Sequence, residues 1–129
     1  MVLVTAMSTK TPIYVAVVDD DESLCRSLGR LLRAANIQPV TYASAEEYLA
    51  DDKHPKFDCV VLDIHLGGMS GIELGHRLVA EGGHAPFIYI TGHDDPETRA
   101  RAEATGCVAY FRKTDSGADV LEAIRRAVA

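Results

Sequence analysis

The chain has 129 residues, 47% of them apolar and 25% charged, which fits one globular domain with a sizeable core. Its formal net charge of -6 opposes direct nucleic-acid binding, which needs clustered basic residues. No apolar stretch approaches the roughly 20 residues of a membrane span, and no signal-peptide pattern opens the chain, so we expect a cytoplasmic protein with no membrane contact.

From residue 12 to residue 129, apolar runs alternate with helical patterns, and we expect this range to form one domain. Residues 1–11 show no periodicity and are predicted to be a flexible tail. The apolar runs predict strands at 13–18, 39–42, 59–62, 87–90 and 108–112. Helical spacing and capping patterns predict helices from about 22 to 35, from 44 to about 51, from 70 toward 82, from 95 to 106 and from 116 onward.

The predicted strands are almost continuously apolar. The run Cys59 to Leu62 is too apolar to have a wet face, and strands of this kind belong to parallel sheets covered on both sides. Crossovers between parallel strands are nearly always right-handed, which places helices on both faces. The sequence therefore predicts an α/β fold with a doubly wound five-stranded parallel sheet in the flavodoxin-like order 2-1-3-4-5.

Polar residues follow four of the predicted strands. Asp19 and Asp20 follow the first strand, Asp63 follows the third, and Thr91 and Lys113 follow the fourth and fifth. Because the carboxyl ends of parallel strands meet at one edge, we expect these side chains to form one site. Carboxylates about 4 Å apart repel by roughly 4 kcal/mol at an effective dielectric near 20, so this cluster needs a proton, a basic partner or a hard divalent cation.

Four stretches in order, VAVVDDDES, CVVLDIHLGGMSGIEL, IYITGHDD and AYFRKT, resemble the receiver domain of two-component response regulators. The resemblance covers about residues 12–129 and is greatest to receivers that usually precede a helix-turn-helix output domain. Whether the chain is a stand-alone receiver stays open. The resemblance implies that Asp63 accepts a phosphoryl group from a sensor histidine kinase or a histidine phosphotransfer protein. Such a receiver catalyses only its own phosphorylation and dephosphorylation and is otherwise no enzyme.

The same resemblance implies a magnesium site. Mg²⁺ would be held by Asp19, Asp20, Asp63 and the backbone carbonyl of His65. Oxygen ligands of this kind suit a small hard cation, which keeps part of its hydration shell.

The resemblance further implies a conformational switch. Thr91 would be the switch hydroxyl, Lys113 the phosphoryl partner and Tyr110 the rotating aromatic. The fourth predicted helix, the fifth strand and the fifth helix would form the face that meets a downstream protein, and a phosphorylation-dependent dimer is one form this contact could take. The fourth helix has a mostly alanine apolar face, so we expect it to be weakly held.

Two positions depart from the family pattern. Gly67 stands where receivers commonly have a proline, and we expect a more flexible loop because glycine fixes no φ. Thr114 stands where receivers usually have a cis-proline. A cis bond before a residue other than proline costs about 2.5 to 4 kcal/mol, so the sequence predicts a trans Lys113–Thr114 bond.

Two other functions remain as alternatives. The stretch Asp19-Asp20-Asp21-Glu22-Ser23 also resembles the DxDx(T/S/V) strand end of haloacid-dehalogenase-type phosphatases, in which Asp19 would be the nucleophile. That hypothesis leaves Asp63 without a role. A degenerate receiver that is never phosphorylated and serves only as an interaction module is the second alternative. Asp21 and Glu22 are expected to cap the helix that follows them.

Overall fold

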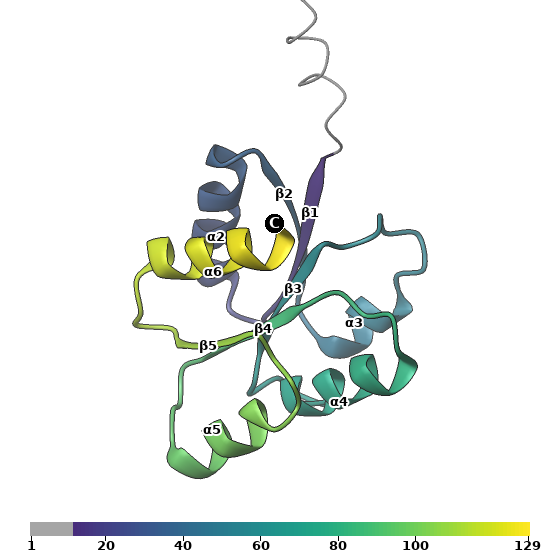
Figure 1. Cartoon of the computed structure of the whole chain (residues 1–129), viewed down its shortest axis with the longest axis vertical. Coiled ribbons are helices and arrows are strands. Elements are labelled where there is room, and N and C mark those ends of the chain that lie inside the picture. Colours follow the sequence, from purple (N-terminus) through teal and green to yellow (C-terminus); the bar gives the residue numbers. More distant parts are fainter. Residues whose placement is uncertain (1–11) are drawn as a thin grey trace, which may run out of the picture.

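A computed structural model describes residues 12–129, so the tail predicted at residues 1–11 lies outside the described residues. Five parallel strands form one sheet in the order β2-β1-β3-β4-β5, which confirms the predicted fold (Figure 1). The strands are β1 (Ile13–Val18), β2 (Ile37–Tyr42), β3 (Cys59–Asp63), β4 (Phe87–Thr91) and β5 (Ala109–Arg112). The helices are α2 (Glu22–Ala34), α3 (Ala45–Ala50), α4 (Gly71–Glu81), α5 (Pro96–Glu103) and α6 (Gly117–Val128).

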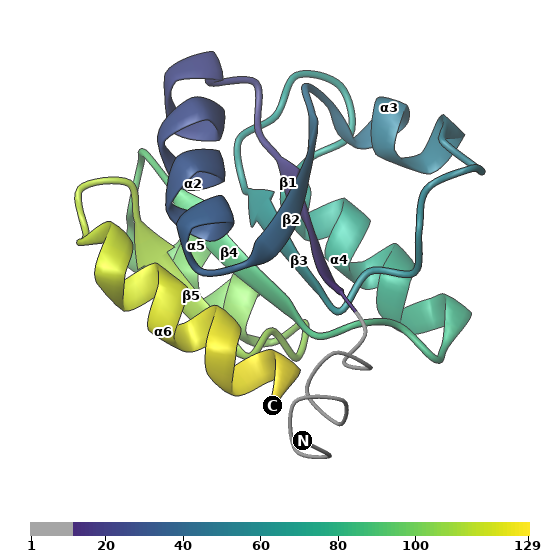
Figure 2. The ribbon, with the colours of Figure 1, turned by 90° about the horizontal axis from the view of Figure 1, so that it is seen from above.

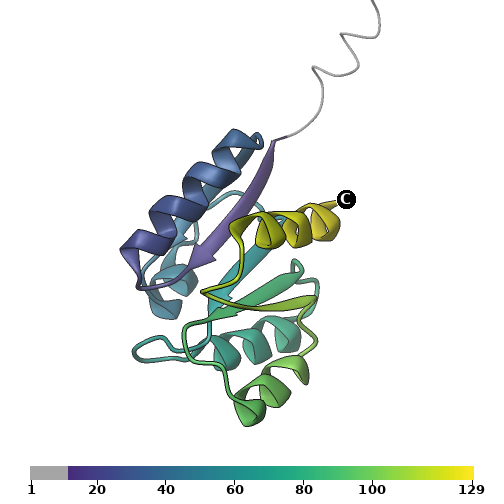
Figure 3. The same cartoon turned by 90° about the vertical axis from the view of Figure 1, so that its left-hand side faces the viewer.

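Helices cover both faces of the sheet, as the apolar strands require. Leu28 and Leu32 of α2 pack with Val120 and Ile124 of α6 in the core of one face. The core of the other face includes buried side chains from α3, α4 and α5. Figure 2 shows α2 and α6 on one side of the strands and α3 and α4 on the other, and Figure 3 shows α4 and α5 together below the sheet. The result is a three-layer domain with two cores.

The starts of two strands differ from the prediction, and β3 and β4 each extend one residue further than predicted. β2 begins at Ile37, two residues earlier than expected, because Ile37 pairs with Ile13 of β1 and its side chain is buried. β5 begins at Ala109, and the Val108 side chain is 55% exposed. β5 is an edge strand, so a residue at its start has no neighbouring strand on the outer side.

Side chains at the N-terminus of each helix accept hydrogen bonds from free backbone amides. The N-cap residues are Asp21, Ser44, Ser70, Asp95 and Ser116, all at predicted helix starts. α5 is weakly anchored, since Ala102 is its only buried residue, in agreement with its alanine-rich sequence. None of the helices between residues 12 and 129 has the length and apolar composition needed to cross a membrane.

The start of α4 packs directly against the backbone of β3. A Cβ added at Gly71 would lie 2.1 Å from the Asp63 carbonyl oxygen. We expect Gly71→Ala to lower the free energy of unfolding by about 3 kcal/mol or more, the upper end for overpacking, because backbone atoms cannot rotate away.

Gly29→Ala in α2 is the control. Its new Cβ would first meet the flexible Arg33 side chain at 3.4 Å, and we expect stabilisation of up to about 1 kcal/mol from alanine's higher helix propensity. Urea unfolding measures both values, and equal effects would contradict this packing argument.

Candidate functional site

The register of the sheet brings the predicted site residues to one edge. Val18 pairs with Leu62, so Asp19 and Asp63 stand at the same level, one residue beyond that pair. Thr91 pairs with Arg112, and the Lys113 amide continues this ladder by donating to the Thr91 carbonyl at 2.7 Å. The carboxyl ends of the four strands β1, β3, β4 and β5 thus meet as the sequence predicts.

Lys113 connects the two buried acids of the site. Its Nζ donates to Asp19 Oδ1 at 3.1 Å and to Asp63 Oδ2 at 3.3 Å, and it lies 3.8 Å from Asp21 Oδ2. Asp19 and Asp63 are only 2% and 3% exposed. Burial works to lower the pKa of Lys113, but the hydrogen bonds and charges of Asp19 and Asp63 outweigh it, and the pKa is raised. An ammonium therefore offsets part of the carboxylate repulsion.

The Asp19 carboxyl has one oxygen in use and one free. Oδ1 accepts hydrogen bonds from the Asp21 amide at 2.9 Å and from Lys113, whereas Oδ2 is buried and has no hydrogen-bond partner among the described residues. The pKa of Asp19 is raised to about 6, chiefly by burial and also by the Asp63 charge, while the hydrogen bond from the Asp21 amide and the interaction with Lys113 oppose the shift. A buried oxygen without a partner costs free energy, and a cation that binds it removes that cost.

Asp20 completes a group of three carboxylates. One oxygen each from Asp19, Asp20 and Asp63 lies within 4.8 Å of the others, and the Asp20 side chain is exposed. The His65 amide donates to Asp63 Oδ1 at 3.1 Å, which places the backbone of residue 65 beside the phosphoacceptor predicted from the sequence. An all-oxygen group with one exposed member fits a hard divalent cation that keeps some of its waters.

Thr91 and Tyr110 are both engaged with the loop between β4 and α5. The Thr91 hydroxyl donates to the His93 carbonyl and accepts from the His93 amide, each at 3.1 Å. The Tyr110 hydroxyl donates to Asp94 Oδ1 at 2.8 Å, and the Arg99 guanidinium lies 4.9 Å from the centre of its ring. The Tyr110 hydroxyl is therefore directed at the loop between β4 and α5.

The family of this chain follows from its match to a known sequence profile. The sequence profile described as the response regulator receiver domain matches residues 15–125. The chain belongs to the receiver domains of response regulators. Receiver domains bind Mg²⁺ at an acidic pocket and interact with histidine kinases or phosphotransfer proteins, and this receiver has a cluster of the three carboxylates of Asp19, Asp20 and Asp63.

Individual relatives agree with the family. Nodulation protein W of Bradyrhizobium diazoefficiens is 36% identical over 93% of this receiver and 52% of its own length. A receiver domain protein of Methanospirillum hungatei has a TM-score of 0.83 at 26% identity, over 92% of this chain and 94% of that one. A response regulator of Burkholderia pseudomallei has a TM-score of 0.77 at 26% identity, over 87% of this chain and 66% of that one. The receiver spans about half the length of the curated relatives it matches.

Some features of the site have no counterpart in the predictions. The Asp94 bond to Tyr110 was not expected, and neither was the edge-to-face pair of the His65 and His93 rings, whose centres are 5.8 Å apart. Asp21 caps α2 as predicted. No cis peptide bond occurs between residues 12 and 129, so the Lys113–Thr114 bond is trans, as predicted.

Proposed function

We propose that this receiver accepts a phosphoryl group on Asp63 from a histidine kinase or a histidine phosphotransfer protein, in a reaction that needs Mg²⁺. The observation that carries the proposal is the contact of Lys113 with both buried acids at the strand ends. The Burkholderia pseudomallei relative is described with a phosphorylated aspartic acid and a calcium ion, which supports the same chemistry here. We propose that residues 12–129 form this signalling domain, that it acts in the cytoplasm, and that it is no enzyme toward other substrates.

In the proposed transfer, a carboxylate oxygen of Asp63 attacks the phosphorus of a phosphohistidine. The new P–O bond forms as the P–N bond breaks, and the donor imidazole leaves with the electron pair. The transition state spreads negative charge over the equatorial phosphoryl oxygens. The Lys113 ammonium is already within hydrogen-bond distance of Asp63 and would stabilise that charge. Asp19, Asp20, Asp63 and the His65 carbonyl would hold Mg²⁺, which would supply further charge stabilisation when bound.

The proposed output is a change on the face formed by α5, β5 and α6. An acyl phosphate on Asp63 would draw the Thr91 hydroxyl away from His93, and Tyr110 would leave Asp94 and turn inward. α5 can respond because Ala102 is its only buried residue. The downstream partner, or a second copy of this receiver, would bind the altered face.

Incubation with acetyl phosphate and Mg²⁺, followed by intact mass measurement, tests the proposed function. We expect one phosphoryl group per chain. Turnover of a phosphomonoester would instead favour the phosphatase with Asp19 as nucleophile. Neither product would favour a degenerate interaction module. Membership of the receiver family favours a single phosphoryl group per chain, because a receiver uses an acid such as Asp63 and the phosphatase hypothesis leaves Asp63 without a role.

Hydrogen exchange with and without beryllofluoride, a phosphoryl mimic, tests the proposed switch. We expect changed protection in residues 91–113, because Thr91, Tyr110 and α5 all lie in this segment. Protection in β1 should stay the same, since its residues Val15 to Val18 are 0% exposed and lie inside the sheet. Identical protection of residues 91–113 with the mimic demonstrably bound would contradict the switch and favour a phosphorelay intermediate.

A further inference from the structure

The loop between β3 and α4 contains two adjacent glycines shortly after His65, a proposed metal-binding residue. Gly67 and Gly68 are both exposed, and Gly68 has a φ of 75°. Gly67 stands where receivers commonly have a proline, so the ring that would restrict this loop is absent. His65, whose carbonyl is a proposed Mg²⁺ ligand, lies two residues before Gly67. A second restraint would be needed to keep that carbonyl in place.

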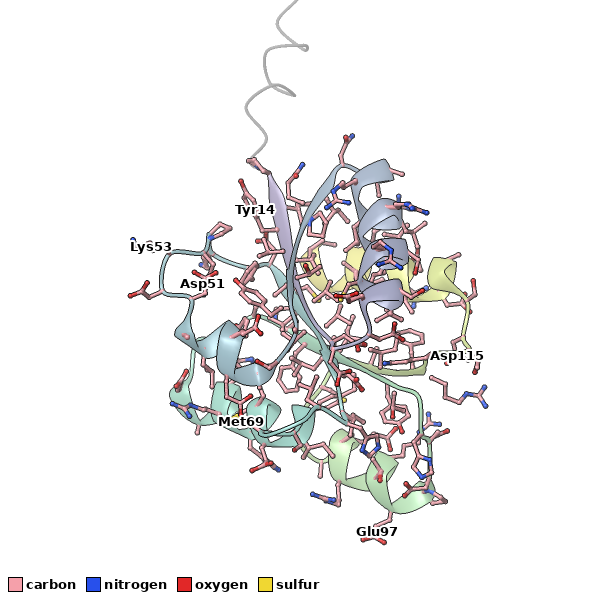
Figure 4. The ribbon with its side chains drawn as sticks, turned by 180° about the vertical axis from the view of Figure 1, so that it is seen from behind. Tyr14, Asp51, Lys53, Met69, Glu97 and Asp115 are labelled. Carbon is pink, nitrogen blue, oxygen red and sulfur yellow. The ribbon has the colours of Figure 1, made fainter. Side chains whose placement is uncertain are left out.

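Glu46 provides a contact to this loop from a distant part of the chain. It lies in the first turn of α3, and its Oε2 accepts a hydrogen bond from the Met69 amide at 2.8 Å. Figure 4 shows Met69 at the start of α4, next to α3. This hydrogen bond lowers the pKa of Glu46, which favours the charged and stronger acceptor.

The glycine at position 68 also fits this contact. A Cβ on Gly68 would lie 2.7 Å from Glu46 Oε2, so the carboxylate occupies the space that any side chain there would need. The positive φ of Gly68 independently disfavours other residues. The absence of a side chain at position 68 therefore leaves room for the Glu46 carboxylate beside the loop backbone.

The other side of the loop is held by its own backbone. The Gly71 amide donates to the Ile64 carbonyl at 3.0 Å, and Leu66 is 8% exposed. Met69, just before the Ser70 cap of α4, is different: its amide donates a hydrogen bond to the Glu46 side chain, which lies outside the loop. The helix dipole explains an acidic residue in the first turn of α3, but it does not explain a bond across 23 residues to Met69.

We propose that Glu46 is a positioning residue, which holds the loop of residues 67–69 so that the His65 carbonyl can serve as a ligand of a metal bound beside Asp63. Glu46 thus replaces the restraint that a proline supplies in other receivers. This role rests on the proposed Mg²⁺ site, and Glu46 itself touches neither the phosphoryl group nor the metal.

Two measurements on Glu46→Ala test the proposal. The Met69 amide should exchange its hydrogen faster by a factor of roughly two to ten, as for the loss of one hydrogen bond. The dissociation constant for Mg²⁺, measured by calorimetric titration, should rise by a factor of roughly three to ten. Loss of a residue that orients a metal ligand typically weakens metal affinity by about 10- to 100-fold, and we expect a smaller effect here because Glu46 is exposed.

Three further variants separate positioning from a general loss of stability. Glu46→Gln keeps an oxygen acceptor and should retain most of the Mg²⁺ affinity. Glu47→Ala removes the same charge from the same turn of α3 and should change neither value. Gly67→Pro, added to Glu46→Ala, should restore affinity, because a Cβ at Gly67 meets no atom within 4 Å and its φ is not positive.

Each contrary result has a distinct meaning. If the unsubstituted receiver binds Mg²⁺ and Glu46→Ala binds it equally well, the positioning role is wrong while the proposed function stands. If exchange at Met69 is unchanged, the contact does not persist in solution and the role is again wrong. If the unsubstituted receiver binds no Mg²⁺, the proposed function fails, and the positioning role fails with it.

Discussion

Asp63→Asn should abolish labelling by acetyl phosphate completely while the domain stays folded. The substitution keeps the shape of the side chain but replaces the nucleophilic carboxylate with an amide, which cannot form the acyl phosphate. Asp63 is 3% exposed and accepts hydrogen bonds from His65 and Lys113, and an amide oxygen can accept one of them. Intact mass measures the labelling, and circular dichroism monitors the fold.

Asp21→Asn is the matched control for this substitution. It removes a carboxylate 3.8 Å from Lys113 in the same acidic cluster, and asparagine caps α2 about as well as aspartate. We expect the control to label normally. Labelling of Asp63→Asn on Asp19 would favour the phosphatase, and loss of labelling in both variants would mean that total charge, rather than the Asp63 nucleophile, governs the reaction.

Asp20→Ala should abolish Mg²⁺-dependent labelling. Asp20 is the exposed member of the three-carboxylate group, so its loss leaves the two buried acids with Lys113 as their shared cation. The fall in Mg²⁺ affinity should exceed the about 10- to 100-fold that the loss of an outer partner of a metal ligand costs, because Asp20 is proposed to bind the metal directly. Calorimetric titration measures the affinity, and intact mass measures the labelling.

Glu22→Gln controls for the loss of one negative charge near the site. Glu22 lies two residues beyond Asp20 in the first turn of α2 and is exposed. We expect nearly unchanged Mg²⁺ affinity in this variant. Unchanged labelling in Asp20→Ala would show that Asp20 is no ligand.

The buried parallel strands and the site edge were predictable because they depend on patterns local to each strand. The runs Ile13 to Val18 and Cys59 to Leu62 are apolar at successive positions, which indicates burial on both faces. An acid or a lysine at the end of such a run can only lie at the carboxyl edge of the sheet. The starts of β2 and β5 were harder to place, since they depend on pairing with a neighbouring strand or on its absence.

Contacts between a loop and a distant strand or helix were not predictable from such patterns. The bond from Tyr110 to Asp94 and the bond from Met69 to Glu46 join residues 16 and 23 positions apart, on elements whose relative placement follows only from the packed fold. The pair Gly67-Gly68 did indicate a loop without its usual restraint. The contact of this loop with Glu46 could not be predicted, because it depends on how α3 packs beside the start of α4.

The role of Asp63 is tested most directly by a crystal structure of the receiver with Mg²⁺ and beryllofluoride. We expect beryllium on an Asp63 oxygen, Lys113 and Thr91 on the fluorine atoms, and the metal bound by Asp20, Asp63 and the His65 carbonyl. Tyr110 should have left Asp94 and turned inward. Beryllofluoride bound to Asp19, or a site that binds neither the metal nor the mimic, would contradict the assignment of Asp63 as the phosphoacceptor.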